Sequence, residues 1–236
     1  MRILKTKNLA EFNQLGANLL LTEMLKSHYR VNLAITAGRT PKGIYDVLIE
    51  QVKDKTYLDN VFYYNFDEIP YQQSDREGIT ISDLRSMYLR PANVAEKNIQ
   101  KMDMTNFNTQ DERILQAGGL DAILLGVGAD GHYCGNLPGT TKFEDLTTEV
   151  VCDEKMKQRI SRLFETKEEV PDSYITMGPR SIMAAHHLIL SACGTEKAEI
   201  IKAFVEGPVT IDLPVTLLKT HPNLTLLVDD EAGSLI

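Results

Sequence analysis

The sequence contains little cysteine and no tryptophan: three cysteines stand in 236 residues. Such an odd, sparse set does not form a disulfide framework, so we expect a reducing compartment. No segment approaches the roughly 18 uncharged residues of a membrane span, and the N-terminal MRILKTKNLAEFNQ lacks the pattern of a signal peptide. The chain is therefore expected to be cytoplasmic, without a membrane partner.

Basic residues do not predominate either. The formal net charge is −8, which argues against a general nucleic-acid surface, because such a surface needs a basic face. A small anionic substrate is not excluded, since a pocket needs only a few local cations. We therefore expect a small-molecule partner and no nucleic acid.

Spacings typical of metal sites are also missing, with no His-x-x-x-His and no Cys-x-x-Cys. Asp130, His132 and Cys134 alternate, but a metal bound there would need further ligands. His186 and His187 are adjacent and would point to opposite sides of a strand. Cys134 is more typical of a small packed thiol, and no metal or cofactor is expected.

Strand and helix patterns alternate along the chain, with no repeat, low-complexity tract or linker, so residues 1–236 are expected to form a single domain. This alternation favours a doubly wound, Rossmann-like α/β fold, with a mostly parallel sheet and helices on both faces. The pattern predicts helices over 9–28, 41–53, 81–90, 109–117, 153–165 and 195–205, and strands over 31–36, 61–66, 123–127, 148–152, 188–192 and 224–228.

The segment LDAILLGVGADGHYCGNLP, residues 120–138, is the most informative part of the chain. An apolar strand stops at a glycine-rich turn that carries Asp130 and His132, at the end of a strand where open α/β sheets bind ligands. Histidine changes charge near neutral pH and is suited to moving protons. Residues 126–131, GVGADG, match the dinucleotide-binding spacing, but loop-forming residues follow where that motif requires a helix, so we predict no nicotinamide site.

Two other strand ends carry candidate residues. Gly38-Arg39-Thr40-Pro41 precedes a helix, where Thr40 could cap the helix and free N–H groups could bind an anion. An ordinary capped turn is the alternative. Asp67-Glu68 follows the strand FYYNF, where one carboxylate could act as a base, or both could be loop acids.

Taken together, these segments resemble the superfamily of glucosamine-6-phosphate deaminases/isomerases and 6-phosphogluconolactonases. The likeness runs in one order from about residue 30 to residue 230. It rests on TAGRTP at 36–41, NFDE at 65–68, LGVGADGH at 125–132, RISRLF at 159–164, GTEKA at 194–198, and VEG followed by HP over 205–222.

The resemblance implies an aldose–ketose isomerase that acts on a hexosamine 6-phosphate and releases ammonia. Asp67 matches the carboxylate that moves a proton between C2 and C1, and His132, supported by Asp130, matches the group that opens the sugar ring. No cofactor or metal is implied, and self-association as a homo-oligomer is possible by resemblance. The residues expected to contact substrate, mainly its phosphate, are Gly38, Arg39, Thr40, Glu68, Arg162 and Lys197.

One position departs from the deaminase pattern. Deaminases have Asn-Glu-Pro where this chain has Asn136-Leu137-Pro138, so the glutamate that partners the histidine is replaced by Leu137. We therefore consider Glu144 as a substitute carboxylate, and galactosamine 6-phosphate as an alternative substrate. The other hypotheses are a 6-phosphogluconolactonase, in which His132 activates water, and a sugar-phosphate-binding protein without catalysis.

Overall fold

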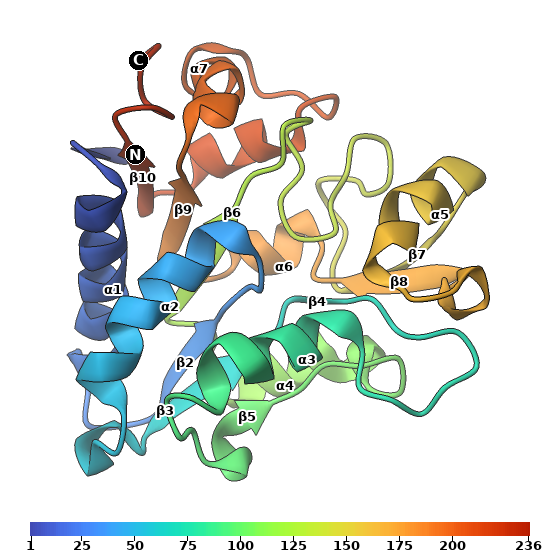
Figure 1. Cartoon of the computed structure of the whole chain (residues 1–236), viewed down its shortest axis with the longest axis horizontal. Helices are drawn as coiled ribbons and strands as arrows, with labels where there is room; N and C mark the ends of the chain where they lie inside the picture. The colour runs from blue at the N-terminus through green and yellow to red at the C-terminus, as the bar shows by residue number, and fades with distance from the viewer.

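The computed structural model describes residues 1–236 and has a seven-stranded sheet. This sheet lies at the centre of the molecule (Figure 1). All neighbouring strands pair in parallel, in the order β1-β10-β9-β6-β2-β3-β5. The predicted α/β fold class is confirmed. The strands are β1 (Arg2–Thr6), β2 (Val31–Ala34), β3 (Val61–Tyr64), β5 (Ile99–Gln100), β6 (Ala122–Gly126), β9 (Leu188–Ala192) and β10 (Leu224–Asp229).

Helices cover both faces of this sheet, and each face has its own apolar core. Within β6, Leu124 packs on one face while Ile123 and Leu125 pack on the other, as the alternation of side chains along a strand requires. The helices of the first face are α1 (Leu9–Leu25), α2 (Arg39–Val52) and α3 (Ile79–Leu84), which continues as a π-helical turn (Arg85–Leu89). Those of the second are α4 (Gln110–Gln116), α6 (Pro179–Met183), α7 (Ala198–Glu206) and a 3-10 segment (Pro214–Thr220).

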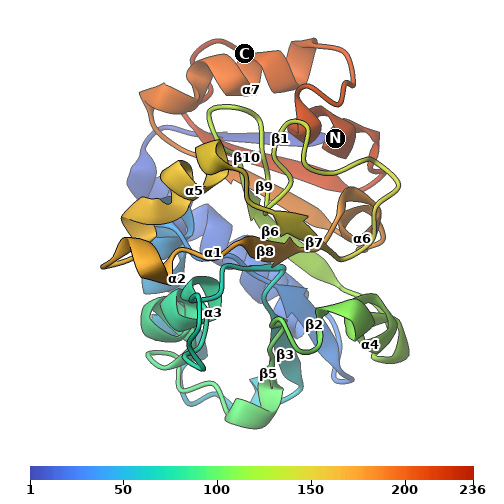
Figure 2. The same ribbon diagram turned by 90° about the vertical axis from the view of Figure 1, so that its right-hand side faces the viewer.

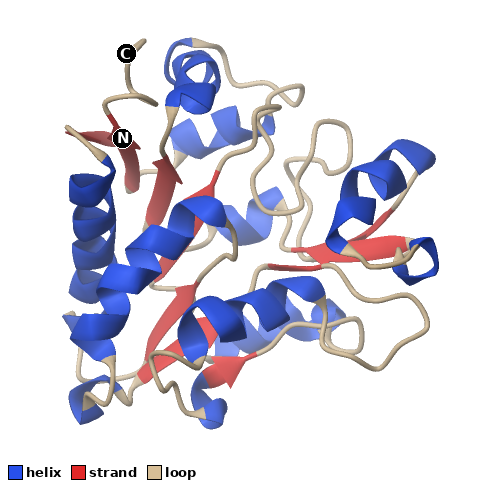
Figure 3. Cartoon of the chain, viewed as in Figure 1, coloured by secondary structure: helices blue, strands red, loops and turns tan.

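A second, antiparallel sheet of three strands lies to one side of the large one (Figures 2 and 3). Its strands are β4 (Asp67–Glu68), β8 (Ser173–Thr176) and β7 (Thr148–Val151), in that order. Helix α5 (Glu154–Ile160) packs against it through a small apolar core. That core consists of Val150, Cys152, Met156, Ile160 and Tyr174, with Leu137 at its margin.

The sequence prediction missed several elements. β1 is the true first strand, 29 positions before the first predicted one at residue 31, and β4, β5, β8 and α6 were also unassigned. The helix expected over 153–165 ends at Ile160 and is followed by a 3-10 turn (Ser161–Leu163). The helix expected from residue 195 begins with a 3-10 turn (Thr195–Lys197). No helix of the structure combines the length and apolarity that crossing a bilayer would require.

A buried carboxylate joins β4 to α3. Glu68 is 1% exposed, and its two oxygens accept the backbone N–H groups of Ile69 (3.0 Å), Thr80 (2.8 Å) and Ile81 (3.0 Å). Two of these N–H groups belong to the first turn of α3, where a helix has no internal acceptors of its own. The bonds fix the position of β4, and with it Asp67, relative to the large sheet.

We predict that Glu68→Gln lowers the free energy of unfolding by about 1–3 kcal/mol, because an amide N–H₂ would replace one buried acceptor and face a backbone donor. Urea unfolding measures the change. Glu50→Gln, on the exposed side of α2, is the matched control and should stay within about 0.5 kcal/mol of the parent protein. Equal stability of the Glu68 variant and the parent would contradict this role.

Candidate active site

A cavity of about 480 Å³ opens at the carboxyl ends of β2, β6 and β9. The strand order reverses between β2 and β6, because the chain proceeds from β2 toward β3 and β5 on one side and from β6 toward β9 and β10 on the other. Such a switch point is the usual ligand site of an open α/β sheet. The cavity brings together Gly38, Arg39, Thr40, Asp67, His132 and Lys197 of the predicted site.

The first turn of α2 forms one wall. Gly38 has φ 133°, a conformation that favours glycine, and the helix begins at Arg39 without a side-chain cap. The prediction that Thr40 caps this helix is therefore wrong: Thr40 lies inside the first turn, with its hydroxyl 3.9 Å from the Sγ of Cys193. An uncapped helix N-terminus presents N–H groups and the positive end of the helix dipole, which favour an anion.

Lys197 adds a cation to the same cavity. It lies in the 3-10 turn after β9, and its Nζ donates to the carbonyl oxygen of Val127 at 2.7 Å, which holds the ammonium against the turn after β6. Arg39 lines the cavity as well, and Glu196 is the neighbouring carboxylate. The two cations outnumber the one carboxylate, so this wall is locally positive although the net charge of the chain is negative.

The turn after β6 holds Asp130 and His132 in contact, with 2.5 Å between Asp130 Oδ1 and His132 Nδ1. A Cβ atom on Gly128 would lie 2.0 Å from the imidazole ring, so glycine is required there for the ring to pack. No helix follows this turn: the chain runs through turns and loops until β7, as the loop-forming residues predicted, so a dinucleotide motif has no helix N-terminus here.

Arg159 of α5 completes a cluster that the sequence did not reveal. Its Nη1 donates to Asp130 Oδ2 at 2.6 Å, and its Nη2 lies 3.1 Å from His132 Nδ1. Burial alone would raise the pKa of Asp130, but the hydrogen bonds from Arg159 and His132 hold it well below its usual range. Burial lowers the pKa of His132, and the charges of Arg159 and Lys197 lower it further, against the opposing effect of Asp130.

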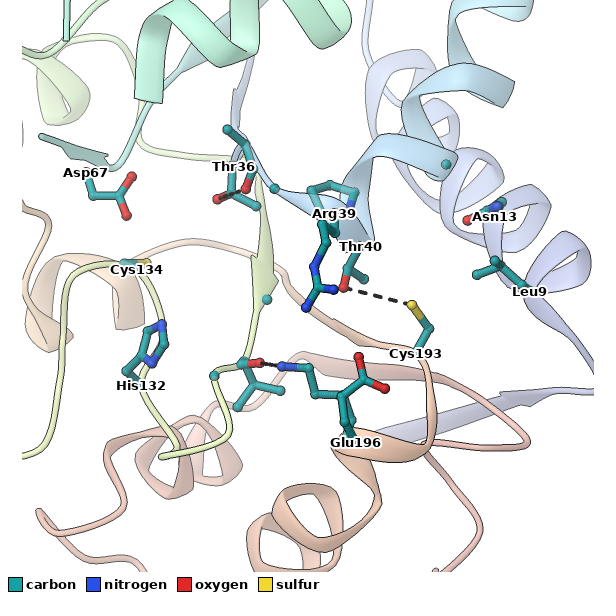
Figure 4. A pocket seen from close by; sticks show the side chains of 18 residues that line it. Leu9, Asn13, Thr36, Arg39, Thr40, Asp67, His132, Cys134, Cys193 and Glu196 are labelled. Atoms are coloured by element: carbon teal, nitrogen blue, oxygen red, sulfur yellow. Dashed lines mark hydrogen bonds between the residues drawn. The ribbon is translucent and has the colours of Figure 1, made fainter. Parts of the chain in front are cut away.

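Asp67 lies at the same end of the cavity as His132, and Cys134 lies between them (Figure 4). Arg39 and Thr40 lie nearer the middle of the cavity in that view. Burial raises the pKa of Asp67 to about 6, and a hydrogen bond with Thr80 opposes the rise. Asp67 is therefore a carboxylate that can gain and lose a proton near neutral pH.

A second cavity of about 230 Å³ adjoins the first, and Asp67, Cys134 and His132 line both. Its other walls come mainly from α5 and the 3-10 turn that follows, with Arg159 and Arg162 among them, and from Leu137. Arg162, expected at the phosphate, thus lies in this second cavity and not beside Gly38 and Thr40.

Two other candidates lie outside both cavities. The Glu68 side chain is buried under α3, where it accepts backbone N–H groups, so the structure does not place it where a substrate could contact it. Glu144 is exposed and lines neither cavity, so it does not replace the carboxylate missing at Leu137. Arg159, a cation, is the charged residue that α5 brings to His132.

Comparison with known proteins gives matches to one family over most or all of the chain. The family model described as glucosamine-6-phosphate isomerases/6-phosphogluconolactonase matches residues 7–226. Glucosamine-6-phosphate deaminase of Thermoanaerobacter pseudethanolicus is 33% identical over 243 residues, which cover 100% of this chain and 95% of the relative. The enzyme of the same name from Listeria welshimeri is 34% identical over 214 residues, covering 86% and 87%.

Solved structures of related proteins have the same fold. A monomeric glucosamine-6-phosphate deaminase superposes with a TM-score of 0.85 at 25% identity, covering 100% of both chains. A 6-phosphogluconolactonase from Trypanosoma cruzi superposes with a TM-score of 0.75 at 18% identity, covering 99% of this chain and 96% of the other, which supports the fold alone. The chain therefore belongs to the family of glucosamine-6-phosphate isomerases and 6-phosphogluconolactonases.

Proposed function

We propose that this protein converts a hexosamine 6-phosphate, glucosamine 6-phosphate first among them, to the ketohexose 6-phosphate and ammonia. The observation that carries the proposal is the cavity with Asp67 and His132 at one end and Arg39 and Thr40 of α2 nearer its middle. Lys197 lines the same cavity. A sugar phosphate bound with its phosphate at α2 would extend C1 and C2 toward Asp67 and His132. The deaminases at about 33% identity over the full chain support this substrate class.

His132 is suited to opening the sugar ring. The Nδ1–H donates to Asp130, which leaves Nε2 as the acceptor for the proton of the O1 hydroxyl. As the C1–O5 bond breaks, the same proton passes from Nε2 to O5, and the chain form acquires an aldehyde at C1. Asp130 sets the tautomer and orientation of the ring without exchanging a proton itself.

Asp67 then acts on carbon. The C2–H bond becomes acidic only once the C1 carbonyl is exposed, and Asp67 removes that proton and returns it to C1. In the same conversion the C2 amino group loses a proton and O1 gains one, so that C1 becomes a CH₂OH group. The product has a C2=N bond, which water attacks before ammonia leaves, so that the C2 carbonyl oxygen comes from water. Binding of the remote phosphate provides free energy that holds C2 in position against Asp67.

Leu137 gives the lactonase alternative its support, because it leaves His132 without the second carboxylate expected in a deaminase. In that alternative His132 activates a water molecule against the lactone carbonyl, and Asp67 is not needed. A cytoplasmic location, self-association, the choice of C4 epimer and the single-domain organisation stay predictions from the sequence.

The direct test is to incubate the purified protein separately with glucosamine 6-phosphate, galactosamine 6-phosphate and 6-phosphogluconolactone. We expect ammonia and a ketose phosphate in equal amounts from an amino sugar phosphate. Acid release from the lactone alone, above its spontaneous hydrolysis, would assign the lactonase activity instead. Binding of hexose 6-phosphates without turnover of any of the three would indicate a sugar-phosphate-binding protein.

Replacement of Asp67 separates the two activities. Asp67→Asn should reduce kcat for the amino sugar phosphate by about 10²–10⁴-fold, the usual contribution of a general base, with little change in KM. Asp46→Asn, an exposed change on α2, is the matched control and should leave kcat unchanged. Nearly full activity of the Asp67 variant on the true substrate would rule out proton abstraction by this residue.

The pH profile should report Asp67 as well. A base must be ionised to act, so kcat/KM should rise with pH through about 6, the raised pKa of this carboxyl. Thr80→Val removes the hydrogen bond that opposes the rise, so this limb should move to higher pH, whereas Ser82→Ala, an exposed change on the same helix, should not move it. A limb that stays in place or moves to lower pH in the Thr80 variant would contradict the assignment.

A further inference from the structure

We propose that Arg159 is a positioning residue that shares the Asp130 carboxylate with His132 and favours the neutral imidazole, with Nε2 free to accept a proton. This inference rests on the proposed function for its kinetic consequence. The effect of Arg159 on the pKa of His132 can be measured without turnover of any substrate.

The geometry places Arg159 against both members of the pair. Nη1 binds Asp130 Oδ2 at 2.6 Å, while Oδ1 of the same carboxylate binds His132 Nδ1 at 2.5 Å, so each oxygen of Asp130 has a charged or polar side-chain partner. Nη2 of Arg159 lies 3.1 Å from His132 Nδ1. Since Asp130 is the stronger acceptor, Nδ1 carries the hydrogen, and Nε2 is the basic atom that remains in the cavity.

The charges around His132 come from four elements and act on its protonation in opposite directions. Asp130, from its own turn, favours the imidazolium, but Arg159 shares this carboxylate and lies close to the ring. Lys197, from the turn after β9, is a second cation that disfavours the imidazolium. Asp67 of β4 lies at the same end of the cavity as His132 and favours the imidazolium when it is ionised.

Arg162 lines the second cavity together with His132 and is a further cation, whereas Leu137 and Cys134 are uncharged at neutral pH. Leu137 contributes no charge, and burial raises the pKa of the Cys134 thiol well above its usual range, so this group stays protonated. The two cations and burial thus act together on His132, and Asp130 is the single carboxylate bonded to it.

This balance matters because an imidazolium cannot accept the O1 proton. A freely exposed histidine would be protonated over much of the range below about pH 6.5. Arg159 lowers the pKa of His132, against the effect of Asp130, and so favours the basic form of the ring. Without Arg159, Asp130 would act on His132 undiminished, and the histidine would begin to limit the rate.

The test is an NMR titration of the histidine ring signals in the full-length protein, with the His132 signal assigned by its loss in His132→Gln. In Arg159→Gln the pKa of His132 should rise by about 0.5–1 unit, the size expected for removing a charge from a half-exposed ion pair. The acidic limb of kcat/KM should move to higher pH in the same variant.

Lys155→Gln is the matched control, because it removes the same charge from the exposed side of α5 and has no contact with Asp130 or His132. Its His132 pKa should stay within about 0.2 unit of the parent value, as expected for a distant, screened charge. An unchanged His132 pKa in Arg159→Gln, or an equal shift in Lys155→Gln, overturns the proposal. The titration needs no substrate, so it decides the role of Arg159 whatever the protein's activity. A protein that turns over none of the sugar phosphates would refute the proposed function, and the His132 titration would still test Arg159.

Discussion

The parallel pairing of β2 with β6 is the constraint on which the site depends. Leu33 pairs with Ala122 and Ala34 with Ile123, so two segments almost 90 residues apart in the chain end at the same edge of the sheet. The chain leaves this pair in opposite directions, and no helix crosses the gap between the two strands at that edge. The N-terminus of α2 and the Asp130–His132 turn consequently form opposite walls of one cavity without any direct bond between them.

The side chains of Glu68, Asp130 and Asp67 lie near this edge of the sheet, and the hydrogen-bond partners of each carboxylate determine its role. Glu68 accepts three backbone N–H groups and holds α3, so it serves the fold. Asp130 is bonded to Arg159 and His132, which keeps it ionised and makes it an orienting group. Burial raises the pKa of Asp67 to about 6, and the hydrogen bond with Thr80 is the main effect that opposes this rise. Burial raises the pKa of Glu68 as well, to about 8, but its oxygens are engaged by backbone N–H groups and it lines neither active-site cavity, so Asp67 is the one of the three that is free to transfer a proton.

The sequence predicted the residues at strand ends and failed for those placed by packing. Apolar runs locate β2, β3 and β6, and parallel strands end at one edge, so Asp67 and His132 could be expected together. Arg159 could not, because the direction of its side chain depends on how α5 packs on a three-stranded sheet whose strand β8 was not recognised. It lies three positions before Arg162, a spacing that puts both on one side of a helical turn, and this was the available signal. β1 was missed because it is a short edge strand with largely exposed side chains.

The departure at Leu137 and the presence of Arg159 act on His132 in the same direction. A glutamate at position 137 would add a second negative charge beside the ring and favour the imidazolium, whereas leucine adds none and packs at the margin of the small apolar core. Arg159 then shares the one carboxylate left to His132. Leucine in place of glutamate at position 137 and the presence of Arg159 would each favour the neutral form of His132. With both, Asp130 is the one carboxylate bonded to the ring. Leu137 and Arg159 therefore form one electrostatic arrangement, in which the turn after β6 adds no second carboxylate and α5 adds a cation beside the ring.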